Sequence, residues 1–193
     1  MNLIIATHNQ HKVEEIKQLL DGKFDKILSA KEMGLSADVE ETGITFFENA
    51  KIKADFVRQQ TDGSFAILSD DSGLCVNALD GAPGVNSNRL AVEGDYKANR
   101  KQLLALLQDK TDRSAKFETC VVFIYPDGKT ISATGNTFGQ ITTEEIGDGS
   151  FGYECVFKSD DLGITFGQAT KKQKNMVSHR ARALQNLCKL LQE

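Results

Sequence analysis

The chain has 193 residues, of which 40% are hydrophobic and 26% charged, and its formal net charge is −4. Such a composition is typical of a globular protein and excludes a disordered chain, because it supplies enough apolar side chains for a core. Nucleic-acid wrapping needs a basic track along the phosphates, and the sequence has no long basic run. No apolar stretch approaches the roughly 20 residues of a membrane span. We therefore expect one cytoplasmic domain over residues 1–193, with neither nucleic-acid nor membrane partners.

The first part of the chain predicts a strand, a polar loop and two helices. Residues 3–6 form a short apolar run that is typical of a buried strand, and residues 7–11 are polar. Apolar residues then recur at helical spacing, at Val13, Ile16, Leu19 and Leu20. Thr45 and Glu48 fit a capping box at the start of a second helix, in which each side chain bonds the other residue's backbone amide.

The remainder of the chain mixes lone strands, a hairpin and further helices. A strand is expected at 65–68, followed by an acidic turn at 69–73. Leucines at helical spacing predict a third helix near 103–107, and Ser178 is expected to cap the last helix. Pro126-Asp127-Gly128-Lys129 separates two β-rich runs, 117–125 and 130–134, which indicates a hairpin. Helices interleaved with lone strands and a hairpin predict an α/β fold with a mixed sheet.

The loop at 7–11 is the first candidate site. A loop that leads from a strand into a helix directs free backbone amides outward, and the helix dipole there favours an anion. Thr7 and Asn9 add polar side chains, and Lys12 places a positive charge in the first helical turn, where it opposes the dipole unless a phosphate is bound. The simpler interpretation is an N-cap by Thr7 or Asn9 beside a solvated lysine.

Two pairs of adjacent carboxylates are the next candidates. Asp70 and Asp71 directly follow an apolar strand, so their side chains are expected to point to opposite faces. One carboxylate can then be structural, while the other holds Mg²⁺ or accepts a proton from water. An Asx turn explains the same residues about as well. Glu40 and Glu41 are sensible metal ligands, although adjacent exposed carboxylates are more often a solvated patch.

Two segments in the last quarter of the chain carry candidate ligand-binding side chains. Phe151 and Tyr153 flank Gly152, and their rings could stack on a base, although two core aromatics are the more common finding. His179 and Arg180 follow Ser178 just inside a helix N-terminus, where an arginine suits an acceptor-rich ligand better than it suits the dipole.

Together these segments resemble one family, the inosine/xanthosine triphosphate pyrophosphatases, which remove non-canonical purine nucleotides. The resemblance extends in order over nearly the whole chain and rests on ATHNQHKVEEI (6–16), EETGITFFENAKIKA (40–54), LSDDSGLCVNALDGAPGVNSNR (68–89), FGYECVF (151–157) and KNMVSHRARAL (174–184). It implies an elongated α/β fold, with a mixed sheet flanked by helices and two lobes about a central substrate cleft, and a homodimer. The implied reaction is magnesium-dependent hydrolysis of ITP, dITP and XTP to the monophosphate and pyrophosphate.

The resemblance also implies a role for each matched residue. Asp71 corresponds to the base that activates water and, with Glu40, to the Mg²⁺ ligands, with Glu41 as the alternative if the register shifts by one. The substrate-binding positions are Thr7, His8, Asn9, Gln10, His11, Lys12, Ser72, Phe151, Gly152, Tyr153, Glu154, Lys174, His179 and Arg180. Among them, Arg180 is the expected donor to the C6 oxygen that distinguishes inosine and xanthosine from adenine.

Several residues depart from the usual pattern of the family. Glu154-Cys155 replaces Asp-Pro after the FGY triplet, His8 stands where glycine is common, and Ser150 replaces a glycine. These departures bear on base preference more than on the reaction. A non-catalytic purine nucleotide-binding protein is the competing hypothesis, which the presence of Lys12, Glu40 and Asp71 together argues against.

Overall fold

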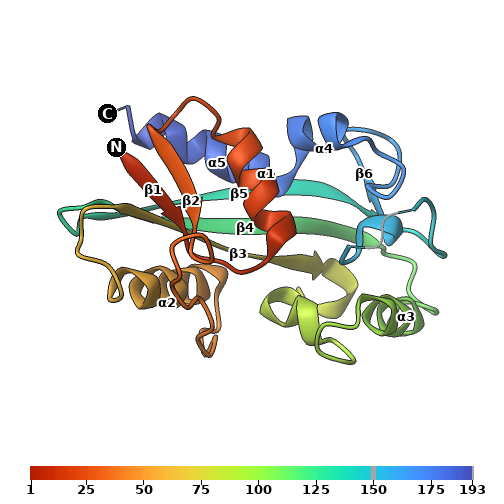
Figure 1. Cartoon of the computed structure of the whole chain (residues 1–193). Helices are drawn as coiled ribbons and strands as arrows, with labels where there is room; N and C mark the ends of the chain where they lie inside the picture. The colour runs from red at the N-terminus through yellow and green to blue at the C-terminus, as the bar shows by residue number, and fades with distance from the viewer. Residues whose placement is uncertain (149–150, 193) are drawn as a thin grey trace. The chain divides into compact units, whose positions relative to one another are not determined.

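The computed structural model describes residues 1–148 and 151–192, which form helices and a six-stranded sheet in the order β2-β1-β3-β4-β5-β6 (Figure 1). The strands are β1 Asn2–Ile5, β2 Lys26–Ser29, β3 Ala66–Val76, β4 Ser114–Ile124, β5 Thr130–Ile141 and β6 Phe157–Ser159. The helices are α1 Gln10–Leu19, α2 Phe46–Arg58, α3 Tyr96–Leu106, α4 Lys171–Val177 and α5 His179–Leu190.

The sheet contains both parallel and antiparallel pairs, which confirms the predicted α/β fold with a mixed sheet. β1 pairs in parallel with β2 and with β3, with Leu3 opposite Ile27 and Ala66. β5 and β6 pair in antiparallel fashion, with Gly139 opposite Ser159. A side chain at Gly139 would meet the Lys158 backbone at 2.2 Å, so the close approach of these two strands requires a glycine there.

The chain divides into two compact units. Unit 1 comprises residues 1–71, 119–135 and 180–193, and unit 2 comprises residues 72–118 and 136–179. Because β3, β4 and β5 each contribute residues to both, the division falls within strands and not at a linker. The arrangement of two lobes about a cleft stays a prediction.

Unit 1 is built on the alternation of side chains along β1. Leu3 and Ile5 pack with apolar residues of α1 and α5, whereas Ile4 and Ala6 pack with α2. Figure 1 accordingly shows α1 and α5 on one face of these strands and α2 on the other. A strand buried on both faces reads as a continuous apolar run, and the run at residues 3–6 has this cause.

Unit 2 has one apolar core, centred on a cluster of phenylalanines. Phe117 of β4 lies 4.6 Å from Phe157 and 6.1 Å from Phe166 between ring centroids. Leu103, in the last turn of α3, and Leu107, just beyond its end, belong to this core. The helix predicted near 103–107 is therefore confirmed, and it begins earlier, at Tyr96.

Most predicted local features are confirmed. The strand, loop and helix at the start of the chain are present, and both halves of the Thr45–Glu48 capping box are formed. The hairpin is present with longer strands than expected, and its turn is closed by the Tyr125 amide donating to Lys129 O at 2.8 Å. The last helix begins at His179, directly after Ser178.

The predicted turn at 69–73 is wrong, because β3 continues without interruption from Ala66 to Val76. Asp, Ser and Gly favour turns by local hydrogen bonding, but here buried cations from other segments bind the two carboxylates instead. The short strands β2 and β6 and the helix α4 were not predicted.

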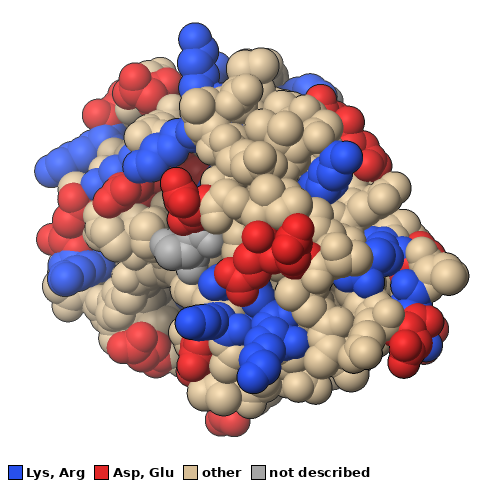
Figure 2. Space-filling view, turned by 90° about the vertical axis from the view of Figure 1, so that its right-hand side faces the viewer, with Lys and Arg blue, Asp and Glu red and all other residues tan. Residues whose placement is uncertain are grey.

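Acidic and basic side chains are interspersed over the face of the molecule drawn in Figure 2. This distribution agrees with the absence of a long basic run in the sequence and with the net charge of −4. Within the described residues, no helix combines the length and the apolarity needed to cross a bilayer.

Candidate active site

Asp70 and Asp71, in the middle of β3, bind partners from different helices. Asp70 contacts Lys12 of α1 and Arg180 of α5, whereas Asp71 contacts Asn49 and Lys53 of α2. All these residues belong to unit 1. Because successive side chains of a strand alternate between its faces, the two carboxylates form two separate centres on either side of β3. The predicted opposite orientation of the pair is thus confirmed.

The Asp70 centre is a buried ion-pair network. Asp70 Oδ2 accepts hydrogen bonds from Arg180 Nε and Nη2, each at 3.1 Å, and lies 3.1 Å from Lys12 Nζ. Arg180 Nη1 also donates to Glu15 of α1. Burial alone would raise the pKa of Asp70, but Lys12 and Arg180 outweigh it and hold that pKa well below its usual range. Lys12 and Arg180 therefore favour the ionised form of Asp70, which makes it a poor proton acceptor.

The Asp71 centre has a different charge balance. Asn49 Nδ2 donates to Asp71 Oδ2 at 3.3 Å, and Lys53 Nζ lies 3.5 Å from Asp71 Oδ1 and 2.9 Å from Glu41 Oε1. Burial raises the pKa of Asp71, and the attraction of Lys53 does not fully offset it. A buried carboxylate with a raised pKa is the form of aspartate best suited to accept a proton.

Glu41, and not Glu40, lies at this centre. Glu41 forms the 2.9 Å ion pair with Lys53, whereas Glu40 is exposed. Asn49 orders the loop that carries Glu41, because its Oδ1 accepts from the Gly43 amide at 2.8 Å. A side chain at Gly43 would meet Glu48 Cβ at 2.6 Å, so this close approach to α2 needs glycine. The geometry favours the alternative register, and Glu40 as a metal ligand stays a prediction.

The Glu41 and Asp71 side chains suit a hard divalent cation. One ammonium group, Lys53 Nζ, reaches an oxygen of each, so a single cation can contact both carboxylates. No three His, Cys, Asp or Glu side chains gather as a potential metal site within residues 1–148 and 151–192. Mg²⁺ is commonly held by one or two carboxylates, with water and substrate phosphates completing its shell, so this donor set fits Mg²⁺.

The opening loop is ordered by its own side chains. Asn9 is the N-cap of α1, and its Oδ1 accepts from the Lys12 amide at 3.3 Å, while Thr7 Oγ1 accepts from the Asn9 amide at 3.1 Å. The simpler interpretation of this loop, an N-cap beside a solvated lysine, is confirmed for the cap, which is Asn9. It is wrong for Lys12, whose ammonium group is buried against Asp70. Burial lowers the pKa of Lys12, and Asp70 opposes that effect.

The other predicted loop residues lie around this cap. His8 is exposed, with Nε2 3.1 Å from Leu35 O and Nδ1 3.5 Å from Asp38. Gln10 Nε2 donates to Glu14 at 3.2 Å, one turn further along α1, and His11 is exposed in the first turn. The structure thus brings Thr7, Asn9 and Lys12 together at the N-terminus of α1, with His8, Gln10 and His11 toward solvent.

In unit 2, Tyr153 belongs to the core. Its side chain is buried at 3% exposure, and its hydroxyl donates to Ser87 O at 2.8 Å. The ring packs among the apolar residues of unit 2, as in the alternative of a core aromatic, and its stacking on a base stays a prediction. Phe151 is partly exposed and packs edge-on against Tyr96, with ring centroids 5.2 Å apart.

The remaining predicted residues of unit 2 are engaged in local contacts. Lys174 Nζ donates to Glu154 Oε1 at 2.6 Å, which links α4 to the segment after Phe151. The imidazole of His179 is buried and stacks on Phe117, with centroids 4.8 Å apart. Ser72 is half-buried on β3, directly after Asp71. Ser150 lies outside the described residues.

Arg180 is placed differently from the expectation. Its guanidinium group is 3% exposed and donates to Asp70 and Glu15, so its position is fixed inside unit 1. A long-range pair of this kind is not visible in the sequence, because 110 residues separate the two partners. Direct contact between Arg180 and a base stays a prediction.

Sequence reasoning missed Asn49 and Lys53. Both lie on the buried face of α2, interleaved with Phe46, Ala50, Ala54 and Val57. A polar amide and an ammonium group within an apolar helical stripe are costly unless they are paired. That interruption of the stripe was the available signal for a buried polar centre.

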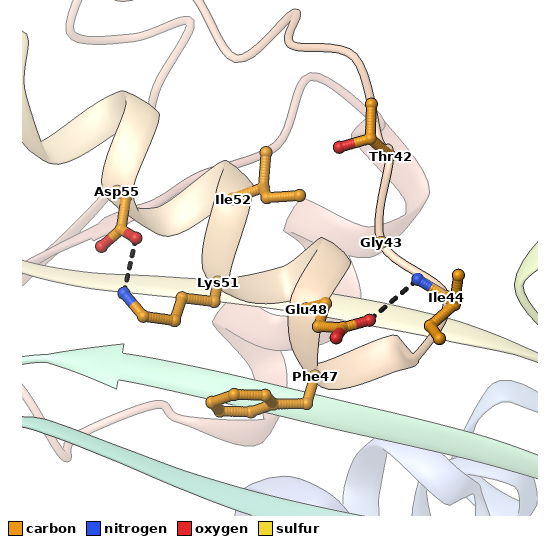
Figure 3. A pocket seen from close by; sticks show the side chains of 8 residues that line it. All are labelled: Thr42, Gly43, Ile44, Phe47, Glu48, Lys51, Ile52 and Asp55. Atoms are coloured by element: carbon orange, nitrogen blue, oxygen red, sulfur yellow. Dashed lines mark hydrogen bonds and ion pairs between the residues drawn. The ribbon is translucent and has the colours of Figure 1, made fainter.

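A surface hollow of about 400 Å³ lies on a different face of α2. Its lining residues include Ile44, Phe47, Lys51 and Asp55, drawn in Figure 3, whereas Asn49 and Lys53 are on the buried face. Lys51 and Asp55 form an ion pair one turn apart on its wall. The hollow is therefore distinct from the Asp71 centre.

These features define an α/β protein that buries ammonium groups and carboxylates beside one central strand, a combination suited to a phosphorylated ligand and a divalent cation. A model of the Ham1 family matches residues 3–190, and the chain belongs to this family.

Relatives with assigned names agree with this membership. The dITP/XTP pyrophosphatase of Thermoanaerobacter sp. (strain X514) is 42% identical over 190 residues, covering 97% of this chain and 94% of the relative. That of Bacillus subtilis (strain 168) is 39% identical, covering 98% and 96%. The Staphylococcus aureus Ham1 protein aligns with a TM-score of 0.88 at 35% identity, covering 100% of this chain and 98% of that one. A HAM1 protein from Coxiella burnetii aligns with a TM-score of 0.89 at 32% identity, with the same coverage.

Proposed function

We propose that this protein is a Mg²⁺-dependent pyrophosphatase that hydrolyses non-canonical purine triphosphates (ITP, dITP and XTP) to the monophosphate and pyrophosphate, and so keeps them out of DNA and RNA. The observation that carries the proposal is the Asp71 centre, in which a buried carboxylate with a raised pKa shares one cation with Glu41. Relatives that are 42% and 39% identical over nearly the whole chain are named dITP/XTP pyrophosphatases.

We assign the metal to Asp71 and Glu41. The sequence alone favoured Glu40 in the place of Glu41. When bound, Mg²⁺ neutralises the charge on the phosphate oxygens. Lys53 contacts both carboxylates, at 2.9 and 3.5 Å, so it offsets part of their negative charge in the metal-free protein. Its pKa is raised, because its attraction to Asp71, Asp70 and Glu41 outweighs burial.

The reaction follows from the properties of the side chains. Asp71 accepts a proton from water, the water oxygen bonds to the α-phosphorus, and the bond from that phosphorus to the bridging oxygen breaks. Pyrophosphate leaves with the bridging oxygen and its electron pair. Lys12 and the dipole of α1 supply positive potential for the phosphates. Asp70 fixes Lys12 by the 3.1 Å ion pair.

By the family resemblance, Phe151, Gly152 and Glu154 match positions around the base. Since Arg180 is committed to Asp70 and Glu15, we assign base selection to the 151–154 segment.

A single assay tests the proposal. The protein is incubated with ITP, XTP, dUTP or ATP and Mg²⁺, and pyrophosphate and orthophosphate are measured separately. We expect pyrophosphate from ITP and XTP and little product from ATP or dUTP. Binding of ITP without product would favour the non-catalytic binding protein, and release of orthophosphate would contradict the proposed bond cleavage.

Removal of the metal is expected to stop hydrolysis. EDTA should abolish pyrophosphate release and Mg²⁺ should restore it, because the leaving phosphates need neutralisation. The apparent Mg²⁺ affinity is then measured by titration for Glu40→Gln and Glu41→Gln. We expect a weakened affinity in Glu41→Gln alone. Full activity in EDTA would contradict the metal requirement. A weakened affinity confined to Glu40→Gln would show that Glu40, and not Glu41, is the metal ligand.

Lys12→Ala is expected to weaken triphosphate binding regardless of the base. A charged donor to phosphate contributes about 1.5–3 kcal/mol, so KM should rise about tenfold to hundredfold for ITP and GTP alike. Lys17→Ala is the matched control, because Lys17 lies on the same helix but pairs with Glu32 at 2.8 Å. A change in the ITP/GTP ratio larger than the common loss would place Lys12 near the base.

We also propose that the protein acts as a cytoplasmic homodimer, as the family resemblance implies. Ile44 at 84% exposure and Phe47 at 42% are apolar side chains that a second copy could cover. Light scattering after size-exclusion chromatography measures the oligomeric state, and a monomer at micromolar concentration would contradict the proposal.

A further inference from the structure

Helix α3 contacts two successive residues, Phe151 and Gly152, of the 151–154 segment to which we assign base selection. Tyr96 packs edge-on against Phe151 at 5.2 Å between ring centroids, and Arg100 Nη1 donates to the carbonyl oxygen of Gly152 at 3.0 Å. Tyr96 and Arg100 are four residues apart, so they lie on the same face of α3. The helix therefore contacts the segment with an aromatic ring and a charged donor.

Arg100 is also the start of a chain of hydrogen bonds that returns to the same segment. Its Nε donates to Glu145 Oε1 at 3.0 Å, and Glu145 Oε2 accepts from the Cys155 thiol at 3.4 Å. Burial raises the pKa of Cys155 to about 11, so the thiol keeps its proton and can donate. Gly152 and Cys155, which bracket Tyr153 and Glu154, are thus tied to one another through Arg100 and Glu145.

These contacts define the orientation of the backbone. The peptide unit between Gly152 and Tyr153 is planar and trans, so fixing the carbonyl on Arg100 directs the Tyr153 N–H to the opposite side. The far end is fixed as well, because the Ile146 amide donates to Cys155 O at 2.8 Å. Cys155 stands where the family pattern has proline, whose ring would restrict the backbone on its own.

We propose that Arg100 is a positioning residue for base selection, which holds the Gly152–Tyr153 peptide in the orientation that discriminates a C6 oxygen from an amino group. With Glu145 it supplies the restraint that the proline would otherwise give. A backbone N–H donates a hydrogen bond to a keto oxygen but is left unpaired opposite an amino group, and this difference is the physical basis of discrimination. The inference rests on the proposed function, because it concerns which base that reaction prefers.

The test compares wild type with Arg100→Gln and Arg100→Lys, measuring kcat/KM for ITP and ATP. Arg100→Gln is expected to lower the ITP/ATP ratio about fivefold or more, since residues in one hydrogen-bond network couple at this level. Arg100→Lys keeps the charge and should recover part of the ratio. Hydrogen exchange of the unliganded protein should become faster across residues 151–156 in Arg100→Gln.

Arg113→Gln is the matched control. Arg113 is a half-buried arginine of unit 2 that donates to the carbonyls of Leu107, Ile141 and Thr142 but not to the 151–154 segment. It should lower thermal stability without changing the ITP/ATP ratio. If Arg100→Gln does not fold, Glu145→Gln replaces it, because it removes the charge that holds Arg100 and keeps the volume; the ratio should fall in the same direction.

The contrary outcomes are distinct. An ITP/ATP ratio that is unchanged in the Arg100 and Glu145 variants, or that falls equally in Arg113→Gln, overturns the role of Arg100 while the proposed reaction stands. A wild-type protein that shows no preference for ITP over ATP overturns the proposed function itself, and base selection by Arg100 falls with it.

Discussion

Asp71→Asn is expected to lower kcat by about 10³-fold or more while the protein stays folded. Loss of a general base alone typically costs about 10²- to 10⁴-fold, and here the same side chain is also a proposed metal ligand. The amide is nearly isosteric with the carboxyl group, and burial already disfavours the charge of Asp71. The free energy of unfolding should therefore change by only about 1 kcal/mol.

Steady-state kinetics with ITP and urea denaturation check this expectation together, and the pH profile gives a second measurement. Because Asp71 must be deprotonated to accept a proton and burial raises its pKa, wild-type kcat/KM should decline as pH falls through that pKa. At subsaturating Mg²⁺ the decline should begin above the ordinary value of about 3.9, because a bound Mg²⁺ would lower the pKa of Asp71. An Asn variant that retains near-normal kcat would remove Asp71 from the reaction.

Features of the fold that depend on neighbouring residues were predictable from the sequence. The Thr45–Glu48 capping box spans four residues and is formed as expected. The opposite orientation of Asp70 and Asp71 required only the alternation of a strand. The apolar run at residues 3–6 correctly indicated a buried strand, since both faces of β1 are covered.

Features that depend on distant pairing were not predictable. The ion pair of Arg180 with Asp70 joins residues 110 apart, and Lys53 meets Asp71 across 18 residues. These pairs also explain the wrong turn at 69–73, because the carboxylates that would form an Asx turn are bound by cations from α1, α2 and α5. The choice between Glu40 and Glu41 likewise depends on the ion pair of Glu41 with Lys53, which the sequence alone does not indicate.

Arg180→Ala is expected to destabilise the protein by about 3–5 kcal/mol, because it leaves Asp70 and Glu15 buried without their main donor. Asp70→Asn should cost a similar amount, since Lys12 and Arg180 then lose their shared anion. Urea denaturation of the two single variants and of the double variant Asp70→Asn/Arg180→Met measures the coupling. The double variant should cost less than the sum of the single changes, because no arginine remains opposite a missing carboxylate.

Kinetics on the same variants decide between two roles for Arg180. If its guanidinium group acts through Asp70, Arg180→Ala should lower kcat/KM on ITP and ATP together. Asp70, the partner of Lys12, is then no longer held by Arg180, while the 151–154 segment is unchanged. If Arg180 were instead the donor to the C6 oxygen, efficiency on ITP would fall about tenfold to hundredfold more than on ATP, the value of a charged donor to a buried acceptor. An unchanged free energy of unfolding combined with a collapsed ITP/ATP ratio would return base selection to Arg180, and the ion pair with Asp70 would then be incidental to the fold.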